Sequence, residues 1–199
     1  MLKIGLTGGI ASGKSEVGRL LATRGAYVVD ADFVAHTVYQ PETEGCALLI
    51  QAFGPEIVAE DGSIDRVRLA ALVFADGAER RRLTDIVWPL TGQAVARLAS
   101  EQEAAGVRVF VVEAPLLVEA GWVGFFDQVW LVRSRPDLVR QRLRQRGLAE
   151  SEVESRLAAA TDPSAAADGS DFVIENDDDL ATLEEAVEAL WRSLQGSAG

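Results

Sequence analysis

Residues 8–15 read Gly8-Gly9-Ile10-Ala11-Ser12-Gly13-Lys14-Ser15, which fits the pattern G-x-x-x-x-G-K-[ST]. An apolar run precedes this stretch, and apolar residues recur at helical spacing after it, so we expect a strand, a loop and a helix in that order. In that setting glycines let successive backbone N–H groups converge on a polyphosphate at the helix N-terminus. The pattern predicts an ATP site at residues 8–16, Glu16 included, in which Lys14 reaches the β- and γ-phosphates and Ser15 binds Mg²⁺.

Other sequence features narrow the class of phosphate chemistry. No lysine follows Lys14, so the Asn-Lys-x-Asp segment that reads guanine in GTPases is absent, as is the Leu-Ser-Gly-Gly-Gln segment of transport ATPases. The loop lacks the proline that precedes the second glycine in adenylate kinases, and no Gly-Gly-Gly loop of the shikimate kinase type follows. With these classes excluded, the sequence indicates a small kinase that recognises its acceptor with some other segment.

Short apolar runs alternate with helical patterns along the whole chain. We expect strands at 2–6, 26–29, 107–112, 128–132 and 172–174, and helices at 14–22, 34–39, 45–53, 65–74, 79–104, 136–145, 151–160 and 180–194. Pro89 should kink or break the long helix that begins at Glu79. Strands that are apolar on both faces and separated by helices predict a parallel sheet covered on both sides. The expected fold is an α/β three-layer P-loop kinase with a five-stranded parallel sheet.

Composition and charge exclude several classes of protein. The 199 residues carry 19 Lys and Arg against 31 Asp and Glu, a net charge of −12, which argues against partners such as nucleic acid or an anionic membrane. Residues 150–199 hold −11 of that charge. A single cysteine, Cys46, excludes a disulfide framework. The N-terminus leads into a glycine-rich segment instead of a signal-type apolar core, so we expect a cytoplasmic protein. We also expect a monomer or a small homo-oligomer.

Two carboxylates, Asp30 and Asp32, follow the second expected strand at the sheet edge where ligands bind. They would point the same way if the strand continued. A carboxylate there can accept the proton of an attacking hydroxyl, although Asp32 could equally cap a helix. Glu113 ends the third expected strand, where it could hold a magnesium-bound water, contact the acceptor or serve a structural role.

The sequence resembles the dephospho-CoA kinase family over nearly its whole length. The resemblance rests on separate motifs, each weak alone: Thr7 to Ser15, Asp30-Ala31-Asp32 with Ala35-His36, Asp65-Arg66 with Leu69 and Val73-Phe74, Pro115-Leu116-Leu117 with Glu119, Arg142-Leu143 with Arg146, and Asp171 to Ile174 ending in Asn176. It implies an enzyme that phosphorylates the ribose 3′-hydroxyl of dephospho-CoA with ATP and Mg²⁺, the last step of coenzyme A biosynthesis. Another nucleoside or nucleotide kinase, or a binding module without turnover, remains an alternative.

The resemblance also implies how the chain is divided. It implies one kinase domain, 1–199, with a core of 1–32, 105–133 and 166–199, a helical acceptor-binding insertion at about 33–104 and a lid at about 134–165. Asp32 would be the base or orienting group for the 3′-hydroxyl, and the acceptor would meet residues from the motifs above: Thr7, Asp32, His36, Arg66, Pro115, Leu116 and Leu117. Glu113, which is outside these motifs, is a further candidate for the acceptor site.

Six arginines follow the fourth expected strand, at positions 133, 135, 140, 142, 144 and 146. Arg142 and Arg146 would share one helix face, whereas Arg140 would lie about 200° around the helix from Arg142. The family motif implies that Arg142 and Arg146 bind ATP, with Arg142 or Arg140 acting on the transferred phosphate. Asn176 could contact adenine or could equally be a turn residue.

Several positions depart from the usual family pattern. Ala11 replaces a common glycine, Glu16 a threonine and Trp88 a histidine. Alanines at 160 and 166 stand where a glutamine and a basic residue are often found, which puts lid contacts from that region in doubt.

Overall fold

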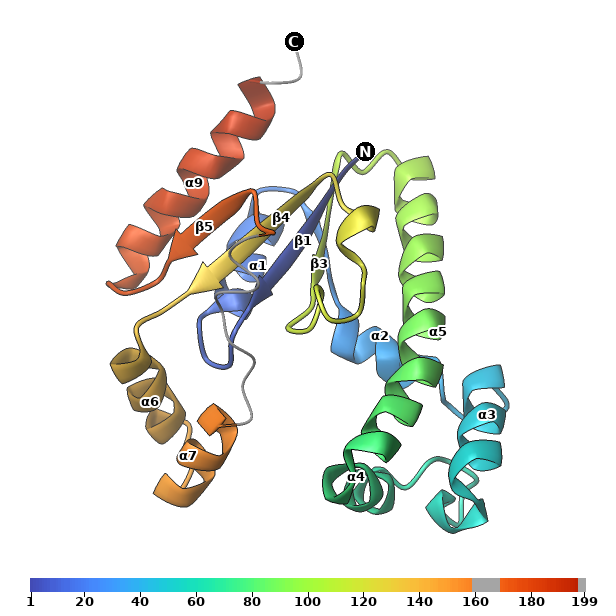
Figure 1. Cartoon of the computed structure of the whole chain (residues 1–199). Coiled ribbons are helices and arrows are strands. Elements are labelled where there is room, and N and C mark those ends of the chain that lie inside the picture. Colours follow the sequence, from blue (N-terminus) through green and yellow to red (C-terminus); the bar gives the residue numbers. More distant parts are fainter. Residues whose placement is uncertain (159–168, 197–199) are drawn as a thin grey trace. The chain divides into compact units, whose positions relative to one another are not determined.

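The computed structural model describes residues 1–158 and 169–196 (Figure 1). The chain divides into two compact units, which we call the loop unit (Met1–Val29 and Gln102–Gly199) and the helical unit (Asp30–Glu101). The part of the expected lid at 159–165, which contains Ala160, lies outside the described residues, as does Ala166. No helix within the described ranges is both long enough and apolar enough to cross a membrane.

A five-stranded parallel sheet confirms the expected fold class. Its strands are β1 (Leu2–Gly8), β2 (Tyr27–Asp30), β3 (Val109–Glu113), β4 (Gln128–Arg133) and β5 (Phe172–Glu175), in the order β2-β3-β1-β4-β5. The central strand β1 pairs Leu6 with Glu113 of β3 and with Trp130 of β4. The C-terminal end of β1, from which the glycine-rich loop leaves, therefore lies between the ends of two other strands.

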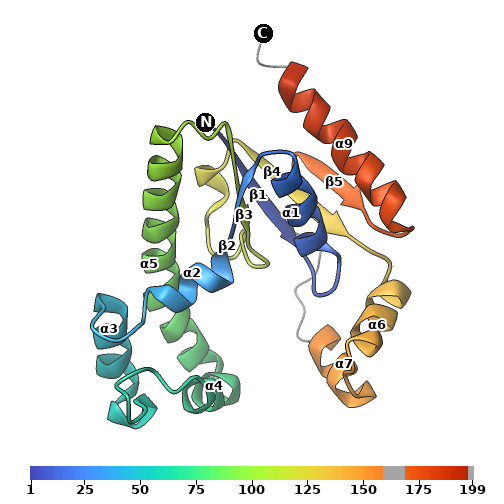
Figure 2. The ribbon, with the colours of Figure 1, turned by 180° about the vertical axis from the view of Figure 1, so that it is seen from behind.

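Helices α1 (Lys14–Thr23) and α9 (Leu180–Gly196) cover one face of the sheet, the face nearer the viewer in Figure 2. Strand side chains alternate between faces, and Ile4 and Leu6, both fully buried, pack into this helix-covered core. Gly5 points to the other face, where a Cβ would lie 2.9 Å from the Phe126 ring and closer still to Leu117. The short helix η2 (Val123–Phe125) belongs to the same segment as Phe126.

Helices α6 (Pro136–Gln145) and α7 (Glu150–Ala158) follow β4. Val139 and Leu143 of α6 and Val153 of α7 form a small apolar cluster with Ala11 of the glycine-rich loop. This cluster anchors the helix pair to the loop.

The helical unit has its own apolar core. It contains α2 (Ala31–Thr37), α3 (Glu44–Phe53), η1 (Pro55–Ile57), α4 (Arg66–Ala75) and most of α5 (Gly77–Ala104). Its buried core residues come from several of these segments: Cys46, Leu49, Phe53, Ile57, Ile64, Leu69, Val73 and Val87. The caps are local, since Thr43 accepts the Cys46 N–H and Asp65 accepts those of Val67 and Arg68.

Helix α5 runs through Pro89 as one helix, so of the expected kink or break the break does not occur. An interior proline removes one backbone hydrogen bond and costs about 3 kcal/mol. On either side of it Val87, Thr91 and Val95 are buried, and the Thr91 hydroxyl donates to the Val87 carbonyl at 2.8 Å. Burial of this face offsets the local cost, so tertiary packing overrides the helix-breaking tendency.

Candidate active site

The glycine-rich loop needs glycine for steric reasons at two positions. A Cβ on Gly8 would collide with the Val132 carbonyl oxygen, and one on Gly13 would collide with the Asn176 side chain. Gly13 also has a φ of 102°, a conformation that residues with a side chain rarely adopt. The loop is thus folded tightly against β4 and the residue that follows β5.

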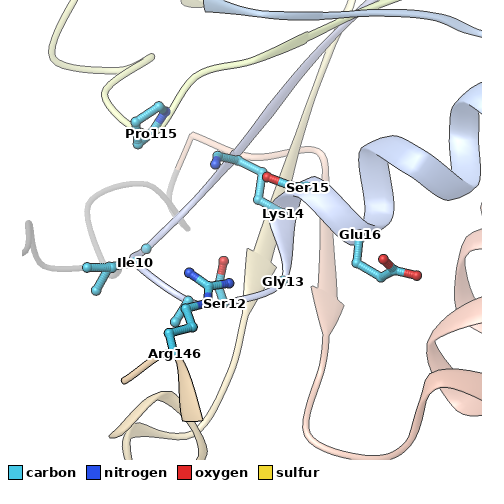
Figure 3. Close-up of a pocket in the computed structure, with 10 residues that line it drawn as sticks. Ile10, Ser12, Gly13, Lys14, Ser15, Glu16, Pro115 and Arg146 are labelled. Carbon is cyan, nitrogen blue, oxygen red and sulfur yellow. The ribbon is translucent and has the colours of Figure 1, made fainter. Parts of the chain in front are cut away.

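A cavity of about 470 Å³ opens over this loop (Figure 3). Residues 9–16 form most of its wall, and Pro115 and Arg146 complete it. In Figure 3 the Lys14 side chain extends from the start of α1 on the side of Pro115, whereas Arg146 lies on the opposite side of the loop. Two cationic side chains and a helix N-terminus therefore surround one cavity.

The Ser12 side chain offers a test of whether this cavity suits a phosphate ligand. Ser12 is only 3% exposed, and its buried hydroxyl has no hydrogen-bond partner in the described part of the chain. A buried hydroxyl without a partner is costly, and phosphate oxygens accept from hydroxyls. Ser12 lines the cavity together with Lys14, Arg146 and the N-terminus of α1, so the cavity fits a polyphosphate better than it fits an apolar ligand.

The carboxylate of Glu16 points away from the loop in Figure 3. It accepts hydrogen bonds from Arg19, one helical turn further along α1, at 2.5 to 3.1 Å. That hydrogen bond holds the pKa of Glu16 below its ordinary value. Glu16 lines the cavity at its rim, but its charge is already paired.

Thr7 and the segment Pro115-Leu116-Leu117 lie together at the end of β1. The Thr7 hydroxyl donates to the Pro115 carbonyl at 3.3 Å, and Thr7 is 2% exposed. Leu117 is fully buried, while Leu116 is 41% exposed. Of these expected acceptor residues, Pro115 and Leu116 present surface, and Thr7 and Leu117 hold the turn in place.

The arginines of α6 have different partners. Arg140 pairs with Glu154 and Arg144 pairs with Glu150, both on α7, at 3.0 and 2.6 Å. Arg146, just beyond the helix end, lines the cavity and has no ion-pair partner among the described residues. Arg142 instead donates to backbone carbonyl groups behind the loop. The structure therefore brings Arg146, and not Arg140, to the phosphate cavity.

Asn176 and Ser134 also lie behind the loop. Asn176, 8% exposed, donates from its side-chain amide to the Ser12 carbonyl at 2.7 Å. The Ser134 hydroxyl donates to the Asn176 carbonyl, and the Ser12 carbonyl oxygen lies 3.4 Å from the same hydroxyl oxygen. Sequence reasoning missed Ser134, although its place directly after β4 put it at the edge of the sheet where ligands bind.

Glu113 is 8% exposed at the C-terminal end of β3. Its carboxylate lies so close to α1 that a Cβ on Gly18 would collide with it. It thus stands next to the helix that begins at Lys14, on the strand beside β1.

In the helical unit, Asp30 and not Asp32 caps α2. The strand ends at Asp30, whose carboxylate accepts the backbone N–H groups of Asp32 and Phe33 at 2.8 and 3.4 Å. The two carboxylates would point the same way only if the strand continued to Asp32, and it does not, because the helix begins at Ala31. Asp32 lies in the first turn of α2 and is exposed. Its carboxylate is not the cap, because Asp30 fills that role.

His36, Tyr39 and Arg66 form a second group in the helical unit. The His36 and Tyr39 rings meet edge to face with centroids 5.9 Å apart. Burial lowers the pKa of His36, and the Arg66 charge lowers it further against the opposing effect of Asp32 and Asp30. Burial raises the pKa of Tyr39, against a lowering by Arg66. A neutral imidazole and a cationic guanidinium therefore lie near Asp32.

A parallel sheet of this strand order, with a G-x-x-x-x-G-K-S loop between β1 and α1, defines a P-loop kinase. The Campylobacter jejuni dephospho-CoA kinase structure shares this fold at a TM-score of 0.74, with 20% identity over 99% of this chain and 98% of that one. A shikimate kinase from Bacteroides thetaiotaomicron shares it at 0.53, with 13% identity over 98% of each chain.

The sequence profile of the dephospho-CoA kinase family matches residues 2–182. The dephospho-CoA kinase of Streptomyces avermitilis is 42% identical over 98% of this chain and 94% of its own length. That of Geobacter sulfurreducens is 41% identical over 94% and 96%. The chain belongs to the dephospho-CoA kinase family.

Proposed function

We propose that this chain transfers the γ-phosphoryl group of ATP to the ribose 3′-hydroxyl of dephospho-CoA, giving CoA and ADP. The match of residues 2–182 to the family carries this proposal. The phosphate cavity over residues 9–16 supports it independently of the comparison. We further propose that the enzyme acts in the cytoplasm on these two small molecules, as a monomer or a small homo-oligomer.

The nucleotide would be held by the loop unit. Backbone N–H groups of residues 9–15 and the Ser12 hydroxyl would donate to the phosphates, and Lys14 would stabilise charge on the β- and γ-phosphates. Arg146 supplies a second cation at the opposite wall, since its guanidinium is not engaged by a carboxylate of the described chain. Most of the rate would come from positioning and charge stabilisation.

The Mg²⁺ ion fits this donor set as a metal held mainly by the nucleotide. The described residues contain no group of three or more His, Cys, Asp and Glu side chains placed to hold a metal. Mg²⁺ commonly binds one or two protein oxygens together with substrate phosphates and water. Ser15, exposed at the first turn of α1, would supply one such oxygen, with Glu113 close to the same helix. The ion would neutralise charge on the β- and γ-phosphates.

The acceptor hydroxyl would be activated by Asp32. As the 3′-oxygen forms its bond to the γ-phosphorus, the bond from that phosphorus to the β,γ-bridging oxygen breaks, and the hydroxyl proton passes to the Asp32 carboxylate. Arg66 and the neutral His36 near Asp32 would bind the acceptor as a cation and a hydrogen-bonding group. The exposed Leu116 would offer it an apolar contact in the loop unit.

A panel of acceptors tests the reaction directly. Purified protein with ATP and Mg²⁺ should form ADP with dephospho-CoA far faster than with adenosine, AMP or other nucleoside monophosphates. Preferential phosphorylation of a nucleoside monophosphate would overturn the proposed acceptor. ATP binding without ADP formation on any acceptor would overturn the proposed activity.

Two aspartates two positions apart test the role of Asp32. Asp32→Asn should lower kcat about 100-fold or more, the usual contribution of acid–base catalysis, with ATP still bound. Asp30→Asn is the matched control, because asparagine caps a helix about as well as aspartate and the charge change is identical. Equal activities of the two variants would remove Asp32 from the proposed role.

A further inference from the structure

Three side chains converge on the carbonyl oxygen of Ser12, on the far side of the loop peptide from its N–H groups. The Asn176 amide donates to it at 2.7 Å and the Arg142 guanidinium at 3.3 Å, and the Ser134 hydroxyl oxygen, whose proton goes to the Asn176 carbonyl, lies 3.4 Å from it. We call Ser134, Arg142 and Asn176 the Ser12 bracket. The Asn176 amide and the Arg142 guanidinium thus use both lone pairs of this carbonyl oxygen.

The members of the bracket also hold each other. Arg142 donates to the Ser134 hydroxyl at 2.8 Å, to the Asn176 carbonyl at 2.8 Å and to the Ala11 carbonyl at 3.3 Å. Ser134 follows β4, Arg142 lies on α6 and Asn176 follows β5. Three segments that are distant in sequence thus act on one peptide of the loop.

The peptide that joins Ser12 to Gly13 is thereby fixed in orientation. In a planar trans peptide the carbonyl and the following N–H point in opposite directions. With the Ser12 carbonyl held by the bracket, the Gly13 N–H must face the other way. The Gly13 carbonyl is fixed as well, since it accepts the Glu16 and Val17 N–H groups at the start of α1.

The close contact between Asn176 and Gly13 also favours this orientation of the Ser12–Gly13 peptide. The side chain of Asn176 occupies the space that a Cβ at position 13 would fill. Rotation of the Ser12–Gly13 peptide would turn a carbonyl dipole toward the phosphates and break the hydrogen bonds from Asn176 and Arg142. The positive charge of Arg142 further favours the observed orientation, with the carbonyl toward the guanidinium.

We propose that Ser134, Arg142 and Asn176 are positioning residues, which hold the Ser12 carbonyl back so that the Gly13 N–H donates to the nucleotide phosphates. The inference rests on the proposed ATP site. Arg142 then acts through the loop backbone, and Arg146 is the arginine that meets the nucleotide. Asn176 likewise acts on the loop instead of on adenine.

Binding of ADP with Mg²⁺, measured by calorimetry, tests this without any acceptor. Asn176→Ala should weaken ADP binding about tenfold and Ser134→Ala about threefold, as expected for the loss of one strong and one weak hydrogen bond. Ser134→Thr keeps the hydroxyl and should restore binding. Arg144→Ala is the control on the same helix, because Arg144 pairs only with exposed Glu150 in the described structure, and it should change ADP binding less than twofold.

A spectroscopic readout separates positioning from simple stabilisation. In protein labelled with ¹⁵N-glycine, ADP should shift the Gly13 amide resonance strongly in the wild type and weakly in Asn176→Ala and Ser134→Ala. Variants that unfold at lower temperature but bind ADP as the wild type does, with the Gly13 shift intact, would overturn the inference. If Asn176→Ala does not fold, Ser134→Ala decides. Failure of the wild type to bind ADP would instead contradict the proposed ATP site, and the bracket with it.

Discussion

The glycine-rich loop and the group around Asp32 in the helical unit are built in different ways. In the proposed function the loop recognises its ligand mainly with backbone N–H groups, and residues 8–15 are contiguous. Around Asp32 the proposed acceptor contacts come from side chains on two helices, with Arg66 on α4 and His36 on α2. Their properties depend on burial and on neighbouring charge. A contiguous backbone site can therefore be recognised in the sequence, whereas a dispersed side-chain site needs the fold.

The prediction with the largest expected effect tests how far the function of the loop depends on Lys14 and how far on its backbone N–H groups. Lys14→Met removes the one lysine ammonium at the cavity and keeps most of the length of the side chain. We expect kcat/KM to fall about 10²- to 10³-fold, as for removal of a donor that stabilises transition-state charge. ADP binding should weaken much less, because the N–H groups remain.

Lys3→Met provides the matched control, since Lys3 and Lys14 are the only lysines and the change of net charge is the same. The Lys3 ammonium lies over the Phe125 ring, 4.9 Å from its centre, and is remote from the residues that line the cavity. Activity within twofold of the wild type is expected. Comparable losses in both lysine variants would mean that net charge, and not the position of Lys14, controls the rate.

Much of the fold could be predicted because local rules and tertiary packing agree. The expected helix 136–145 matches α6 residue for residue, since Pro136 suits a first helical position. Pro89 is the exception, because burial of Val87 and Val95 outweighs the local cost of a proline inside α5. Asp30 and Asp32 are equally good cap residues by type, and only the end of β2 decides between them.

Only part of the candidate site could be predicted from the sequence, because the role of a side chain depends on partners from other segments. Helical geometry correctly separated Arg140 from Arg142, but the fate of each arginine depends on its partners. Glu154 on α7 holds Arg140, and carbonyl groups behind the loop hold Arg142. Neither partner is marked by a motif, because an ion pair or a bracket requires only that two segments meet in space.

A smaller effect is expected in the helical unit, where His36 should make the stability of the protein depend on pH. His36 is the only histidine, so its titration can be followed alone. Burial and Arg66 lower its pKa in the folded state, so the unfolded chain takes up the proton first as pH falls. The free energy of unfolding should therefore decrease as pH falls below the ordinary histidine value of about 6.5. His36→Gln should lose this decrease between pH 7 and 5.5, measured by urea denaturation.

The midpoint of the His36 resonances in a proton NMR titration should likewise lie below 6.5. An identical slope of stability against pH in the wild type and His36→Gln would contradict the assignment, as would a midpoint above the ordinary value. A loop built from backbone groups should show no such dependence over this range, since amides do not titrate there.

The smallest expected effect concerns Ala11, where the loop departs from a common glycine. Ala11 has a φ of 54°, in the left-handed region that costs a residue with a side chain about 1–2 kcal/mol. Ala11→Gly removes that strain but loses a buried methyl group, worth about 0.8 kcal/mol, and adds about 0.5–1 kcal/mol of backbone entropy cost. These terms nearly cancel, so thermal unfolding should show a change in stability below about 1 kcal/mol. Ala11→Val, by contrast, should destabilise strongly, because a β-branched side chain disfavours this conformation. A large gain from glycine would mean that contact of the Ala11 methyl group with Leu143 and Val153 contributes little, and that the loop depends on its backbone alone.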